Sequence, residues 1–126
     1  MASPTPPAGV TFHRNGIAAH GQDTDQLKAF STLLSQLGHR NETIDILKID
    51  VEGAEYDVFL DGATLPLMRK TVRQILLEVH YKGEERTVAL ARAFTDAGFF
   101  VFSKEPNIQY SSGDCVEFSL LNTQLV

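Results

Sequence analysis

The feature that most constrains the fold is the order of its segments. Twice along the sequence, a short apolar run is followed by apolar residues at helical spacing. The runs cover residues 44–50, before Gly53, and 74–81, the most apolar stretch of the chain. Their β propensity and length indicate strands, and the second run has the length of a central strand covered on both faces. Apolar residues at helical spacing occupy 54–60 and 84–97. We therefore expect parallel strands joined by helical crossovers.

The rest of the chain extends this pattern at both ends. A capping-box sequence at Asp23 precedes apolar residues at helical spacing, which predicts a helix over residues 24–37. Residues 10–12 are a candidate edge strand. Residues 99–102 and 115–121 indicate two further strands, joined as a hairpin. The predicted fold is an α/β sandwich whose sheet is largely parallel and ends in a C-terminal antiparallel hairpin.

Length and composition limit the domain organisation and the partners. The 126 residues suit one domain, placed at 10–126, and three prolines among the first seven residues predict a disordered lead-in over 1–9. The chain has 11 basic and 16 acidic residues, a net charge of −5, which argues against nucleic-acid binding. Its single cysteine, Cys115, excludes an internal disulfide and is expected to be a small buried side chain.

No segment of the sequence has the character of a membrane span or a signal peptide. No apolar stretch approaches the roughly 20 consecutive residues that cross a bilayer, and the first residues lack a basic region followed by an apolar one. We therefore expect a soluble chain without a membrane span. An intracellular location is the default expectation, since no signal in these residues fixes the compartment.

Acidic residues stand where the first predicted strand ends. In open parallel sheets, ligands bind beyond the carboxyl ends of the strands, and Asp50, Glu52 and Gly53 lie at such an end. Gly53 permits a sharp turn and a close approach of the backbone to a ligand. The two carboxylates can bind a divalent cation, accept a hydrogen bond from a ligand amine or act on a substrate hydroxyl. A structural interpretation is equally open, in which Asp50 caps the next helix.

A second polar pair, Glu78 and His80, ends the most apolar predicted strand. If the two strands are parallel neighbours, these side chains emerge at the same rim as Asp50, and one cleft contains carboxylates and an imidazole. His80, with an unperturbed pKa of about 6.5, is then a candidate general base or metal ligand. The alternative left open is a structural histidine that is hydrogen-bonded to a loop.

Three segments carry a resemblance to a known family, in addition to the spacing of apolar residues described above. They are Lys-Ile-Asp-Val-Glu-Gly-Ala-Glu at 48–55, Glu-Val-His at 78–80 and Val-Glu-Phe-Ser-Leu-Leu-Asn at 116–122. Their succession resembles the FkbM-type and related methyltransferase-like domains, class I enzymes that use S-adenosylmethionine. The resemblance spans about 10–122 and implies a Rossmann-like methyltransferase sheet. It also implies methyl transfer from S-adenosylmethionine, to oxygen in the full-length enzyme, with a small molecule or a molecule of unknown class as the acceptor.

The resemblance implies roles for six residues at the rim. They are the donor contacts Asp50, Glu52 and Gly53, the acceptor contacts Glu55 and Glu78, and the catalytic base, which is Asp50 or His80. Methyl transfer needs such a base only where the attacking atom still carries its proton. The resemblance assigns no residue to a metal ion.

One departure from the family concerns the donor. Such enzymes bind the donor at a glycine-rich loop after the first strand, yet none of the nine glycines of this chain forms a Gly-x-Gly pair. The resemblance thus covers the C-terminal half of the fold and implies that the first strands are missing. We therefore expect a fragment, or a chain completed by another one, that binds the donor poorly and is inactive alone.

The missing strands leave a specific edge open. Without a first strand, the apolar strand at 44–50 has no neighbour on one side, so we predict a homodimer, a completing chain or poor solubility. Two functions from other classes remain open beside methyl transfer. One is a non-catalytic interaction module that pairs through this edge, and the other is a metal-dependent hydrolase that uses Asp50, Glu52 and His80.

Overall fold

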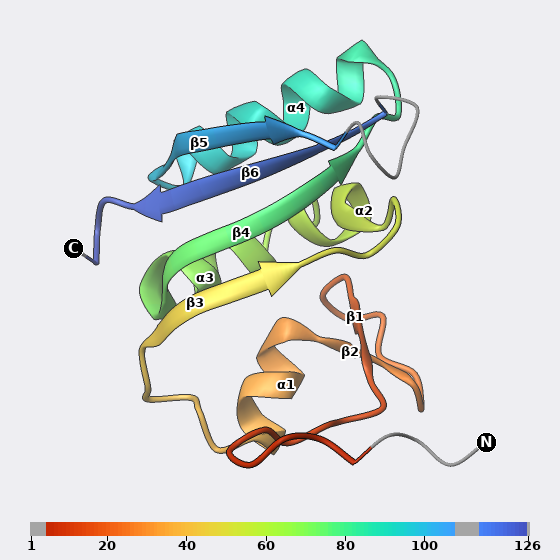
Figure 1. The fold of residues 1–126 in the computed structure, drawn as a ribbon, viewed down its shortest axis with the longest axis vertical. Helices are drawn as coiled ribbons and strands as arrows, with labels where there is room; N and C mark the ends of the chain where they lie inside the picture. Colours follow the sequence, from red (N-terminus) through yellow and green to blue (C-terminus); the bar gives the residue numbers. More distant parts are fainter. Residues whose placement is uncertain (1–4, 108–113, 126) are drawn as a thin grey trace.

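The centre of the fold is a four-stranded sheet in the order β3-β4-β6-β5 (Figure 1). Its strands are β3 (Ile44–Ile49), β4 (Val72–His80), β6 (Cys115–Asn122) and β5 (Phe99–Pro106). Each of them overlaps a run that the sequence predicts as a strand. The computed structural model describes residues 5–107 and 114–125, so the first four residues of the predicted lead-in lie outside the described part. Residues 5–9 form neither helix nor strand.

The direction of the strands agrees with a largely parallel sheet, because β3, β4 and β5 run the same way and β6 alone of the four runs against them. β3 pairs with β4 in parallel, but β6 runs antiparallel to both β4 and β5. β4 and β5 therefore point in the same direction, as their helical connection requires, and β6 lies between them. The predicted hairpin of β5 and β6 is confirmed, and its insertion beside β4 is what makes the sheet mixed.

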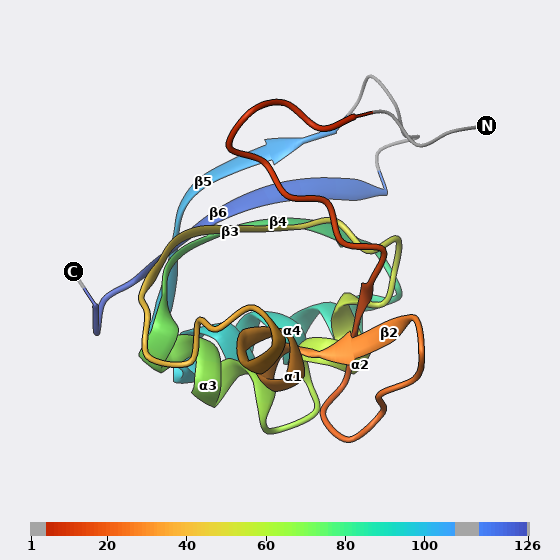
Figure 2. The ribbon, with the colours of Figure 1, turned by 90° about the horizontal axis from the view of Figure 1, so that it is seen from below.

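The four helices found in the described residues lie on one face of this sheet (Figure 2). They are α1 (Phe30–Gln36), α2 (Glu55–Phe59), α3 (Thr64–Thr71) and α4 (Glu84–Asp96). Burial alternates along β4, where Ile75, Leu77 and Val79 are buried and the residues between them are partly exposed. The prediction that this strand is covered on both faces is therefore wrong, because no helix of the described residues packs on the second face.

The core lies between the helices and the covered face. Phe94 of α4 contacts two other rings, with its centroid 4.8 Å from that of Phe59 in α2 and 6.0 Å from that of Phe99 in β5. Met68 of α3 and Ile75 of β4 are fully buried in the same cluster. Among the described residues, no helix is long and apolar enough to cross a membrane.

The N-terminal region differs from its prediction. β1 (Gly16–Ala18) and β2 (Leu27–Ala29) form a separate two-stranded parallel sheet. β2 occupies part of the helix predicted over 24–37, and the edge strand expected at 10–12 is not formed. The prediction failed here because strands of three residues show too little periodicity to be recognised.

Two aspartates accept hydrogen bonds from backbone N–H groups at the starts of α1 and α3. Asp23 Oδ1 accepts a hydrogen bond from Ala29 N at 2.7 Å, and α1 begins after Ala29, beyond the capping box expected at Asp23. Asp61 Oδ1 accepts hydrogen bonds from Ala63 N and Thr64 N, both at 2.8 Å. Asp61 thereby satisfies the first N–H groups of α3, a helix that the sequence analysis did not predict.

Candidate functional site

The carboxyl ends of β3 and β4 form the rim that the sequence predicts as the site. The two strands are parallel neighbours, with Ile49 opposite Leu77, so the residues after them leave the sheet at the same end. At this end of the sheet, Asp50 Oδ1 lies 4.0 Å from His80 Nε2, which confirms that the two strand ends share one rim. We call this group of side chains the rim cluster, and its members are Asp50, Glu52, Glu78 and His80.

The turn between β3 and α2 places Glu52 beside the histidine. Glu52 has a φ of 52° and Gly53 one of 101°, so two successive residues have positive φ. Glu52 Oε2 lies 3.4 Å from His80 Nε2, although 82% of the Glu52 side chain is exposed. A Cβ on Gly53 would lie 2.9 Å from Lys82 Cε, so the lysine covers this glycine. A ligand that approached Gly53 closely would displace Lys82.

Asp50 does not have the capping role that the sequence left open. The residue at the start of α2 is Ala54, and no side chain forms a capping hydrogen bond there. The Asp50 side chain is 38% exposed and faces His80 Nε2 instead. The structural interpretation of Asp50 is therefore wrong.

Helix α2 fixes the position and orientation of His80. His80 Nδ1 is 2.5 Å from Glu55 Oε1, and the same oxygen accepts a hydrogen bond from His80 N at 3.1 Å. Tyr56, the next residue of α2, donates its hydroxyl to His80 O at 2.6 Å. With Nδ1 held on this side, Nε2 is directed towards the carboxylates of the rim cluster. His80 thus has a structural role through one ring nitrogen and is available for chemistry through the other.

Carboxylates surround the second ring nitrogen of His80. The carboxylate oxygens of Glu52, Glu78 and Asp50 lie 3.4, 3.9 and 4.0 Å from Nε2. Burial lowers the pKa of His80, but the hydrogen bond and the charge of Glu55, with the charges of Glu52 and Glu78, raise it by more. The pKa of His80 therefore lies above its usual 6.5, and the ring holds its proton to a higher pH than a free histidine does.

Glu55 lies behind His80, in the protein interior. Its side chain is completely buried, and its Oε2 has no hydrogen-bond partner among the described residues. The resemblance implies a contact between Glu55 and the acceptor, whereas the structure places Glu55 against the His80 ring. Its position suits a residue that orients the histidine.

Three further residues beside the rim cluster were not foreseen from the sequence. Cys115 is paired with His80 in the antiparallel ladder of β4 and β6, and its side chain is buried, as expected. Asn107 Nδ2 donates a hydrogen bond to Glu78 Oε1 at 3.4 Å. Both come from the last hairpin, whose register no local motif encodes. The sequence could have indicated Tyr56, because this residue directly follows Glu55.

Two sets of side chains in the described residues bring potential metal ligands together. One set is Asp50, Glu52 and His80, and the other is Glu78, His80 and Cys115. Within each set the ligand atoms lie within 4.8 Å of one another. The first set is the more accessible to solvent, because Cys115 is buried.

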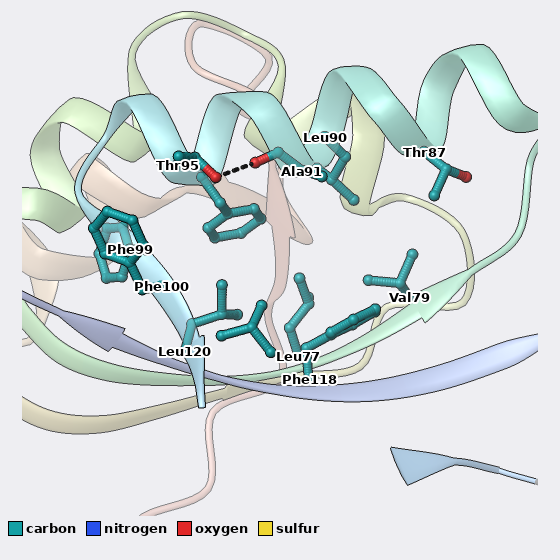
Figure 3. A pocket seen from close by; sticks show the side chains of 12 residues that line it. Leu77, Val79, Thr87, Leu90, Ala91, Thr95, Phe99, Phe100, Phe118 and Leu120 are labelled. Atoms are coloured by element: carbon teal, nitrogen blue, oxygen red, sulfur yellow. Dashed lines mark hydrogen bonds between the residues drawn. The ribbon is translucent and has the colours of Figure 1, made fainter. Parts of the chain in front are cut away.

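A separate apolar cavity of about 300 Å³ lies between α4 and the sheet (Figure 3). Leu77 and Phe118 line it from the sheet, and its polar side chains are Thr87 and Thr95 of α4. Both threonine hydroxyls donate hydrogen bonds to carbonyl oxygens one helical turn earlier. The residues that line the cavity include no charged side chain, so the rim cluster remains the candidate site for chemistry.

Sequence comparisons relate the chain to known proteins. Residues 10–122 match a family described as a methyltransferase domain. A segment of the AMB antimetabolite synthetase AmbE of Pseudomonas aeruginosa is 44% identical over 73 residues, which are 56% of this chain and 3% of that protein. No solved structure matches the chain significantly. Because the family match covers most of the sequence, the chain belongs to this family of methyltransferase domains.

Proposed function

We propose that the chain is part of an S-adenosylmethionine-dependent methyltransferase of FkbM-like type that methylates an oxygen atom. The observation that carries the proposal is that two strand ends with polar side chains meet at the rim. Two of the three segments that carry the sequence resemblance lie at the ends of neighbouring parallel strands, and their side chains approach within 4.0 Å at Asp50 and His80. Membership of a methyltransferase domain family supports the class of reaction.

The charge of the rim suits the donor. S-adenosylmethionine supplies a methyl group on a positively charged sulfur. Asp50, Glu52 and Glu78 give the rim negative charge, and two of these side chains are accessible, with exposed fractions of 38% for Asp50 and 82% for Glu52. Opposite charges attract most strongly where water is partly excluded. We therefore assign Asp50 and Glu52 to the donor side of the site, and Gly53 as well once Lys82 has moved.

The rim also offers groups that take the proton of an attacking hydroxyl. His80 accepts a proton only after Nε2 has lost its own, and its raised pKa delays this to higher pH. The base in this proposal is Asp50 or His80, and the raised pKa of His80 moves its contribution to higher pH. Glu55 and Tyr56 position the histidine, and Glu78 is the contact for the acceptor.

An NMR titration tests this proposal on the chain itself. Backbone amide spectra are recorded while S-adenosylmethionine is added up to millimolar concentration. We expect weak binding, with shift changes concentrated at residues 50–53 and 78–80. S-adenosylhomocysteine, which lacks the positive charge on sulfur, should shift the same amides less. Shift changes that are absent, or that centre on the apolar cavity, would contradict donor binding at the rim.

A matched pair of variants controls for general charge effects. Asp50→Asn should weaken donor binding about tenfold, which corresponds to about 1.4 kcal/mol. Asp57→Asn removes an exposed carboxylate from α2 and should leave the binding unchanged. Micromolar binding measured by calorimetry would contradict the expectation that this chain holds an incomplete donor site.

A further inference from the structure

We propose that Asp50, Glu52 and His80 form a binding site for a divalent transition-metal ion such as Zn²⁺. Neither the family match nor the sequence resemblance assigns a metal ion to this chain. The proposal concerns binding of the ion alone. It uses Asp50 and Glu52, which the proposed function assigns to the donor, and its tests contain no methyl donor.

The ligand types and their spacing suit such an ion. One imidazole nitrogen and two carboxylate oxygens are ligands that Zn²⁺ accepts, at about 2.0 to 2.2 Å from the metal. Two ligands at this distance and at tetrahedral angles are about 3.4 Å apart. Glu52 Oε2 lies 3.4 Å and Asp50 Oδ1 4.0 Å from His80 Nε2. All three atoms lie within 4.8 Å of one another, so small side-chain rotations complete the set.

The site is open to solvent on one side. The Asp50 and Glu52 side chains are 38% and 82% exposed, whereas His80 is 16% exposed. An ion therefore reaches the ligands from solvent, and water can occupy the remaining coordination position. Three protein ligands with an open position are typical of catalytic zinc sites, and structural zinc sites are closed by four ligands.

Glu55 provides an independent observation in favour of the site. Histidine ligands of metal ions usually donate their other ring N–H to a carboxylate, which fixes the tautomer and the ring orientation. Glu55 Oε1 occupies this place, 2.5 Å from His80 Nδ1. The Glu55 side chain is completely buried, and its Oε2 has no partner among the described residues. A buried carboxylate needs a compensating positive charge, which a protonated His80 or an ion on the same imidazole supplies.

The local charge around His80 is negative and would attract a divalent ion. The carboxylates of Glu55 and of the rim cluster all lie within 4.0 Å of one imidazole ring. A protonated His80 offsets one of these negative charges, and Lys82 is a further cation close to the turn. A divalent ion adds two positive charges at the centre of the cluster. The rival explanation is an imidazolium paired with carboxylates, which has no affinity for metal ions.

Zinc titration of the metal-free chain separates the two explanations. The protein is treated with a chelator, dialysed and titrated with Zn²⁺ in a calorimeter at neutral pH. We expect one bound ion per chain and a higher thermal midpoint in excess Zn²⁺. Mn²⁺ should bind more weakly than Zn²⁺. A Zn²⁺ dissociation constant of about 1 mM or weaker would overturn the proposal.

Matched variants show which side chains bind the ion. Asp50→Asn and Glu52→Gln should each weaken Zn²⁺ binding at least about tenfold, or about 1.4 kcal/mol. Asp57→Asn, on the exposed side of α2, should bind Zn²⁺ as the wild type does. Equal affinities in all three variants would indicate general attraction to an acidic surface and would overturn the proposal.

Cys115→Ser tests the neighbouring set of ligands, Glu78, His80 and Cys115. We expect this variant to keep its affinity for Zn²⁺. Loss of binding in Cys115→Ser, together with normal binding in Glu52→Gln, would assign the ion to the other set and refute the proposal.

Glu55→Gln tests the positioning of the histidine ligand. The change should weaken Zn²⁺ binding by about 10- to 100-fold, as loss of such a carboxylate partner does in other metal sites. In the wild type, ¹⁵N spectra of the His80 ring should show that Zn²⁺ replaces the proton on Nε2 and leaves the one on Nδ1. A ring that keeps both protons at saturating Zn²⁺ would exclude His80 as a ligand.

Discussion

Glu52 combines an exposed carboxylate with a backbone conformation that L-residues avoid. Its φ of 52° lies in the left-handed region, which costs about 1 kcal/mol or more for most residues other than glycine. Glu52→Asn and Glu52→Ala both remove the charge near His80, but asparagine tolerates this region better. We expect the asparagine variant to be the more stable by roughly 0.5 to 1 kcal/mol in urea unfolding. Equal stabilities would show that the turn relaxes around residue 52.

Asp61 should make the stability of the fold sensitive to acid. Burial raises the pKa of this carboxyl, but hydrogen bonds from the Thr64 hydroxyl and from the N–H groups of Thr64, His20 and Ala63 lower it by more, to below its usual 3.8. The folded pKa is thus lower than the unfolded one. The stabilisation is therefore complete well above pH 3.8 and is lost as the pH falls through the folded pKa.

Thermal midpoints measured between about pH 5 and pH 2 check this expectation. The wild type should lose more stability over this range than Asp61→Asn, whose amide does not titrate. Asp57→Asn serves as the control, because Asp57 is exposed, and it should follow the wild-type curve. Parallel curves for the wild type and Asp61→Asn would contradict the role of Asp61.

Among the elements, β6 is tied to the junction of α3 and β4 by one buried amide. Asn122 is completely buried, and its Nδ2 donates hydrogen bonds to Arg69 O at 2.8 Å and Val72 O at 2.7 Å. Asn122→Ala removes both of these buried hydrogen bonds, which should lower the free energy of unfolding by about 2 to 4 kcal/mol. Urea unfolding measures this loss. Gln124→Ala, an exposed neighbour, should cost much less, and similar losses would argue against this role of Asn122.

The strands that build the rim could be predicted from the sequence because their signals are local. Residues 44–50 and 74–81 are apolar runs of strand length, and each is followed by a helical pattern. The position of β6 could not be predicted, because register and strand order depend on contacts between distant residues. For the same reason Cys115 was not expected beside His80. The burial of Glu55 was also missed, because glutamates are mostly exposed unless a partner such as His80 binds them.

At the scale of the whole molecule, the sheet has a covered face and an open edge. Within the described residues β3 pairs with β4 alone, and Ile46 of β3 is 58% exposed. Unpaired backbone groups on an apolar edge strand favour pairing with another chain. The charge of Lys48 in β3 opposes this pairing only weakly. We therefore predict a dimer that forms through β3 as the concentration rises.

Size-exclusion chromatography with light scattering checks this prediction over a range of concentrations. Ile46→Glu should shift the equilibrium to the monomer, because it places a charge beside the edge. Val88→Glu is the matched control, since Val88 is 49% exposed on α4, a helix that contacts β5 at the opposite end of the sheet order from β3. A wild-type chain that remains a monomer with a cooperative melt at every concentration would contradict the prediction.

The insertion of β6 between β4 and β5 has a consequence for synthesis on the ribosome. β5 is translated before β6, yet within the described residues β6 is its ladder partner. A nascent polypeptide that has released β5 but still holds residues 115–122 in the exit tunnel cannot join β5 to the rest of the sheet. The apolar sides of α4 and β5 then stay accessible to chaperones until translation has delivered the last strand.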